Sequence, residues 1–162
     1  MTVKFNAFEV FEIAEQIERN GTNFYVRAAE LFDDPDIRRT FLALAEWEKK
    51  HERTFARMKQ QVSEQSQRTN TSEVGGSLPD PRVMAGLAVF GIRSDPVEEL
   101  RGRQKKTDII RRAVEKEKDS IVFYHGLKEF VPGGADRDRI DDIIKEEMRH
   151  IVILDQSLKQ YL

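Results

Sequence analysis

The chain has 162 residues, with 27 basic and 29 acidic side chains, a formal net charge of −2 and no cysteine. The absence of cysteine excludes disulfides, thiol nucleophiles and thiolate-held metal sites, and the near-neutral charge gives no electrostatic reason to expect nucleic-acid binding. No apolar run is long enough to span a membrane, and the first residues lack the apolar stretch of a signal peptide. We therefore expect a soluble, cytoplasmic protein with a single domain over residues 1–162.

Two helices are predicted in the first part of the chain. Apolar residues recur at helical spacing from about residue 6 to residue 32, and Asn6 with Glu9 matches a capping box at the start. Asp34 and Pro35 suit the N-cap and first position of a second helix that extends to about residue 65. Because only a tight turn separates the two helices, we expect an antiparallel hairpin over residues 6–65.

A second hairpin is predicted over residues 96–161. Its main helices cover about 108–131 and 136–161, separated by a Pro-Gly-Gly turn that starts at Pro132. Between the hairpins, residues 66–95 are first polar and then interrupted by prolines and glycines, which is typical of a crossover between the two ends of a bundle. The predicted fold class is all-α, a four-helix bundle of two hairpins with a long crossover between its second and third helices.

The two hairpins are weak copies of each other. A gap-free shift of 99 residues gives eight identities in the 43 aligned pairs that start at Ile13. The retained residues in each hairpin are a glutamate, a Phe-Tyr pair and a Glu-x-x-His motif. The matched pairs in these motifs include Glu18 with Glu117, Tyr25 with Tyr124, Glu48 with Glu147 and His51 with His150, and the other identities are Ala14 with Ala113, Phe24 with Phe123, Glu30 with Glu129 and Arg38 with Arg137.

Each predicted helix places a carboxylate in its apolar stripe. Residues three apart on a helix share a face, so Glu48 and His51 project together, as do Glu147 and His150. Burial of an unpartnered carboxylate costs roughly several kcal/mol, and the apolar stripes contain no lysine or arginine. Two divalent metal ions would balance four such charges and accept two neutral imidazoles. The predicted metal ligands, which are also the predicted catalytic residues, are Glu18, Glu48, His51, Glu117, Glu147 and His150.

The spacing suggests a division of roles within this set. Glu48 and Glu147 are expected to bridge the two metals, with one terminal glutamate and one histidine on each metal. The alternative is an ion-paired structural bundle that has lost its metal. Tyr25 and Tyr124 are predicted either to bond ligand carboxylates or to pack in the core.

Several neighbours of the ligands are predicted to have other roles. Glu15 and Glu146 are expected on solvated flanks, and His125 is expected at the surface. Trp47 is predicted to pack against a neighbouring helix or subunit.

The segments IERNGTNFY, AEWEKKHERTF, VEKEKDSIVFY and IKEEMRHI resemble the rubrerythrin-like branch of the ferritin superfamily. The resemblance implies a ferritin-like, up-down-down-up four-helix bundle with two iron ions per site. It also implies ferroxidase or peroxidase-type activity toward O2 or hydrogen peroxide, with Fe(II) as a partner, in iron or oxidative-stress handling. Bacterioferritin binds haem through a methionine after the second-helix glutamate; Lys49 stands there in this chain, so no haem is expected.

Two departures from the rubrerythrin pattern matter. Rubrerythrin proper adds a rubredoxin-like domain with four cysteine ligands, so a peroxidase cycle in this cysteine-free chain requires an external electron donor. Rubrerythrins also carry an extra glutamate one turn after the third-helix ligand, where this chain has Ser120. Manganese is admissible in the same ligands, which leaves a di-manganese catalase-like enzyme and an iron-storage protein with little turnover as alternatives.

A homodimer or small oligomer is expected, because exposed apolar residues need cover. A dimer in which hairpins are exchanged through residues 66–95 is a further alternative, with no nucleic-acid or membrane partner in either case. The apolar residues that led to this expectation are Phe5, Phe8, Leu87, Val89 and Phe90.

Overall fold

The computed structural model of the protein describes residues 7–69, 99–131 and 133–162. The helices are α1 (Ala7–Glu30), α2 (Pro35–Thr69), α5 (Lys106–Leu127) and α6 (Ala135–Lys159), and a 3-10 turn, η1 (Lys128–Phe130), follows α5. No strand occurs within these described ranges. The predicted all-α class is confirmed, and every helix end lies within four residues of its predicted position.

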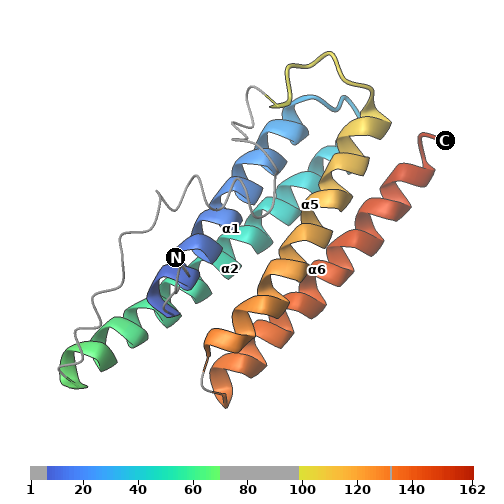
Figure 1. Cartoon of the computed structure of the whole chain (residues 1–162). Helices are drawn as coiled ribbons and strands as arrows, with labels where there is room; N and C mark the ends of the chain where they lie inside the picture. Colours follow the sequence, from blue (N-terminus) through green and yellow to red (C-terminus); the bar gives the residue numbers. More distant parts are fainter. Residues whose placement is uncertain (1–6, 70–98, 132) are drawn as a thin grey trace, which may run out of the picture.

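The helices form two hairpins that lie face to face (Figure 1). In the view of Figure 1, α1 runs upward, α2 and α5 run downward, and α6 returns upward. This is the up-down-down-up order that requires a long connection between α2 and α5. Residues 66–69 of the predicted crossover belong to α2, and residues 70–95 lie outside the described part of the chain.

The helix boundaries follow local sequence chemistry. The Asp34 carboxylate accepts hydrogen bonds from the backbone N–H groups of Asp36 (2.8 Å) and Ile37 (3.2 Å), so it caps α2 as predicted. Before α6, Gly133 and Gly134 have φ values of +113° and +72°, which residues with a Cβ rarely adopt. The predicted cap at Asn6 lies outside the described residues.

Two apolar clusters fill the bundle along its axis, one on each side of its middle. The first includes Phe11 and Ile17 of α1 together with Phe55 of α2. The second includes Phe24 of α1 and Phe41 of α2. On every helix, the predicted ligands lie between these two clusters, so the fold places the polar site inside a largely apolar core.

Helices of the described part are too short or too polar to cross a membrane. Phe8, one of the residues expected to need cover, is 37% exposed. The others, Phe5, Leu87, Val89 and Phe90, lie outside the described residues, so the expected oligomer stays a prediction.

Candidate metal centre

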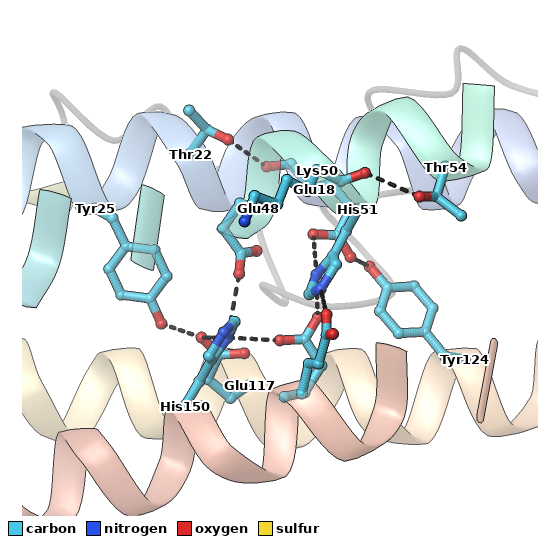
Figure 2. A network of polar contacts seen from close by, with 12 residues as sticks. Glu18, Thr22, Tyr25, Glu48, Lys50, His51, Thr54, Glu117, Tyr124 and His150 are labelled. Carbon is cyan, nitrogen blue, oxygen red and sulfur yellow. Dashed lines mark hydrogen bonds and ion pairs between the residues drawn. The ribbon is translucent and has the colours of Figure 1, made fainter. Parts of the chain in front are cut away.

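The six predicted ligands meet at the middle of the bundle, and Figure 2 labels all of them except Glu147. All six residues are buried, with at most 4% of each residue exposed. Figure 2 shows His51 and His150 side by side between the two hairpins, and their ring centroids are 5.9 Å apart. The full set is Glu18 from α1, Glu48 and His51 from α2, Glu117 from α5, and Glu147 and His150 from α6.

The ligand atoms divide into two overlapping groups, each within 4.8 Å and able to hold a metal ion. Glu48 and Glu147 belong to both groups. The two oxygens of Glu147 also face different histidines, since Oε1 lies 3.1 Å from His51 Nδ1 and Oε2 lies 2.8 Å from His150 Nδ1. One group is Glu18, Glu48, His51 and Glu147, and the other is Glu48, Glu117, Glu147 and His150. This geometry fits two cations that share two carboxylates.

Six inward-facing ligand atoms form ion-pair contacts with one another but make no well-aligned hydrogen bond. Buried polar atoms are almost always hydrogen-bonded in folded proteins, so a cluster of such atoms points to a missing group. The donor set of four carboxylates and two imidazoles suits divalent iron or manganese. The six atoms are Glu18 Oε2, Glu48 Oε1, both Glu147 oxygens, and Nδ1 of His51 and His150. The residues therefore fit a pair of metal ions.

Burial and mutual repulsion perturb the pKa values of the site. Burial, with the charges of Glu48 and Glu117, raises the pKa of Glu147 to about 8. The pKa of Glu48 is raised well above its usual range by burial and by Glu18 and Glu117. Burial lowers the pKa of His150, but surrounding carboxylates outweigh it and bring that pKa to about 12. Without metal, the site thus holds protons that a bound cation would displace.

Two tyrosines hold the terminal glutamates from the opposite hairpin. The Tyr25 hydroxyl of α1 donates to Glu117 Oε1 of α5, and the Tyr124 hydroxyl of α5 donates to Glu18 Oε1 of α1. Both tyrosines are buried, and Figure 2 shows them at opposite ends of the site. The structure shows both roles predicted for these tyrosines, since each bonds a candidate ligand carboxylate and each belongs to an apolar core cluster.

The prediction that Glu146 lies on a solvated flank is wrong. Its carboxylate bonds His51 Nε2 at 2.6 Å, and its side chain is 28% exposed. Because this contact joins α6 to α2, spacing along α6 could not indicate it. Trp47, predicted to pack against a neighbouring helix or subunit, stands edge-on to His150 of α6 at 6.2 Å between ring centroids.

The remaining neighbours are not at the site. His125 is exposed, as predicted. The Glu15 side chain, predicted on a solvated flank, is only 15% exposed, and its carboxylate pairs with Arg19 and Lys59 rather than with a ligand. Sequence reasoning missed Lys116, which is buried beside the ligand Glu117. Its ammonium pairs with Glu99 at 3.0 Å rather than with a ligand.

Gly21 is a second residue that sequence reasoning missed, although a glycine inside a helix one turn after Glu18 was a signal. A Cβ at this position would lie 2.5 Å from Glu48 Oε2 and 3.2 Å from Glu48 Cδ. The carboxylate of a shared ligand therefore occupies the space that a side chain at residue 21 would take. Glycine inside a helix costs about 0.5–1 kcal/mol of stability relative to alanine. The close approach of Glu48 explains why glycine is nevertheless present at residue 21.

We expect Gly21→Ala to lower metal affinity about tenfold without unfolding the protein, since Glu48 must move but only at the end of a flexible side chain. Calorimetric titration with Co(II) measures the change. The matched control is Gly126→Ala in α5, where an added Cβ meets nothing within 4 Å. That control should stabilise the fold by about 0.4–1 kcal/mol and leave affinity unchanged. Equal affinities in the two variants would contradict the role given to Gly21.

A four-helix bundle that buries four glutamates and two histidines at its centre defines the class of ferritin-like dinuclear carboxylate proteins. The chain belongs to the Rubrerythrin family, whose family model matches residues 9–158. Comparison with curated proteins gives no match.

A solved structure supports the same class. The chain is similar to a protein of Thermotoga maritima described as a candidate ferritin-like diiron-carboxylate protein. The TM-score is 0.75 at 25% sequence identity, and the match covers 100% of both chains. The predicted ferritin-like fold and the predicted rubrerythrin-like family are confirmed, and the buried Glu/His cluster fits a di-iron site.

Proposed function

We propose that this protein is a non-haem di-iron oxidoreductase with ferroxidase or peroxidase-type activity toward O2 or hydrogen peroxide. The observation that carries the proposal is the pair of buried ligand groups that share Glu48 and Glu147. Shared carboxylates would hold two bound ions next to each other, whereas two separate sites would not. The chemistry that two adjacent Fe(II) ions supply is the transfer of two electrons together to one oxidant.

The protein's own residues support this chemistry in three ways. Four carboxylates are hard donors, which favour the higher oxidation state of iron. Tyr25 and Tyr124 hold the terminal glutamates in place through hydrogen bonds that do not come from the metal ligands. The two apolar clusters close the bundle above and below the site and keep bulk water from the ligands.

The source of electrons distinguishes the two activities. A ferroxidase takes its electrons from Fe(II) itself, whereas repeated peroxide reduction needs a donor that re-reduces the site. The chain has no cysteine, so it holds no rubredoxin-type centre. Under peroxidase turnover, an external reductant would have to deliver electrons to the bundle.

The test is an anaerobic Fe(II) titration of the apo-protein, followed by mixing with O2 or hydrogen peroxide while absorption spectra are recorded. We expect two Fe(II) per chain and rapid oxidation that is lost in His150→Ala. Preloading with redox-inactive Zn(II) is the control and should block oxidation. Faster reaction with peroxide than with O2 would favour the peroxidase. Uptake of Mn(II) in place of Fe(II) would contradict the di-iron assignment, and uptake of neither metal would contradict the function as a whole.

A further inference from the structure

The inner ligands follow the twofold repeat of the sequence closely. The shift of 99 residues places Glu18 on Glu117 and His51 on His150. Each histidine turns Nδ1 toward the shared carboxylate of Glu147, at 3.1 Å for His51 and 2.8 Å for His150. Judged by these ligands alone, the two metal positions would be equivalent.

The two halves of the site differ in the residue that contacts each imidazole from outside the ligand cluster. His51 Nε2 bonds Glu146 Oε2 at 2.6 Å. The residue that the repeat matches to Glu146 is Trp47, and its ring stands edge-on to His150. His150 pairs with Glu48, Glu117 and Glu147, in each case through Nδ1, and within the described ranges no carboxylate is hydrogen-bonded to its Nε2. One histidine therefore has a carboxylate behind it and the other has an indole.

This difference should strengthen metal binding through His51 relative to binding through His150. A carboxylate that accepts the outer N–H of a ligand histidine holds the proton on Nε2, leaves the Nδ1 lone pair for the metal, and strengthens the imidazole as a donor. Glu146 also adds a negative charge close to a cation bound through His51. The indole of Trp47 can orient His150 by packing but supplies neither a charge nor an acceptor.

We propose that the two metal positions are inequivalent, and that a divalent metal ion binds first at the position built on His51 because Glu146 orients that imidazole. The position built on His150, backed by Trp47, fills second. Glu146 acts through His51 and is a positioning residue. This inference rests on the proposed function in one respect only, namely that the six ligands bind two metals.

The test is a titration of the apo-protein with Co(II), followed by calorimetry and by the visible absorption of the bound ion. We expect two separate binding steps. The tighter step should be lost in His51→Gln and kept in His150→Gln. Glu146→Ala should weaken the tighter step by about 10–100-fold, and Glu146→Gln should weaken it less, because an amide oxygen still accepts a hydrogen bond. The matched control, Trp47→Phe, should leave the tighter step unchanged.

A second readout uses the single tryptophan of the chain. In a titration with Zn(II), which does not quench fluorescence by energy transfer, most of the change in Trp47 emission should come with the second equivalent. Far-ultraviolet circular dichroism tests whether each apo variant is folded. We expect the Glu146 variants to fold, because the Glu146 side chain is partly exposed.

The outcomes separate this inference from the proposed function. Two Co(II) ions bound with equal affinity, or an unchanged tighter step in Glu146→Ala, would overturn the inequivalence and leave the dinuclear site intact. A tighter step lost in His150→Gln rather than in His51→Gln would reverse the order and overturn it as well. The absence of any Co(II) binding would overturn the proposed function and this inference together.

Discussion

Glu147→Gln should abolish binding of both metal ions, whereas Glu117→Gln should abolish binding of one. Glu147 belongs to both ligand groups, and its two oxygens face the two histidines separately. Glu117 belongs to only one group. The amide of glutamine has the size of the carboxylate but carries no charge, so the substitution tests the ligand role with little change in packing.

The expected loss of Fe(II) affinity is large, because Glu147 is a candidate ligand of both metal ions. Substitution of a residue behind a ligand typically costs 10–100-fold in affinity or activity, so loss of a shared ligand should lower Fe(II) affinity and the oxidation rate by more than about 100-fold. Fe(II) stoichiometry under anaerobic conditions and the initial rate with O2 measure the two effects. Glu115→Gln is the control, because Glu115 is exposed and two residues from Glu117 on another side of α5. Retention of one metal in Glu147→Gln would show that Glu147 is not shared.

The cluster of candidate ligands was predictable because its sequence signal is local and repeated. A Glu-x-x-His motif is a property of one helix face, and its recurrence in both hairpins indicates function without knowledge of the fold. The ends of the helices were predictable for a similar reason, since Asp34 and the Pro-Gly-Gly turn act on their own neighbours.

The residues that sequence reasoning misplaced act between helices. Glu146 reaches His51 across the α2–α6 contact, and Gly21 makes room for Glu48 across the α1–α2 contact. Lys116 is buried, and its ammonium pairs with Glu99, which precedes α5 in the chain and therefore lies outside the periodicity of that helix. Helical periodicity defines which face of a helix is buried but not which residue of another helix it meets.

Removal of a ligand should also stabilise the metal-free protein. Four carboxylates are buried at the centre of the bundle, and the pKa of Glu147 is raised from 4.5 to about 8, first by burial and then by Glu48 and Glu117. A carboxyl whose pKa is higher in the folded state favours unfolding at any pH above its unfolded value. At about 1.4 kcal/mol per pKa unit, the cost from Glu147 at pH 7 is roughly 3 kcal/mol.

Apo Glu147→Gln should therefore melt about 6–12 °C above the apo wild type at pH 7, at 2–4 °C per kcal/mol for a chain of this size. The sign of the pKa shift gives the pH dependence. The cost is absent below about pH 4.5, grows up to about pH 8 and is constant above it, so the gain in Tm should be small at pH 5 and complete at pH 8. Thermal unfolding followed by circular dichroism with a chelator present measures both.

With metal bound, the wild type should become more stable than Glu147→Gln, which reverses the order of stability of the apo-proteins. At a free metal concentration 100 times the Kd, each occupied position adds about 2.7 kcal/mol to the stability of the folded wild type. Two positions together exceed the gain from the substitution, and Glu147→Gln binds at neither. The surface variant Glu115→Gln should match the wild type within about 0.5 kcal/mol in both conditions. An apo Glu147→Gln protein less stable than the apo wild type would mean that the carboxylates stabilise the bundle through their ion pairs with the histidines. In that case the site would be a structural network, whereas a gain on removal identifies buried charge that the fold keeps for its metals.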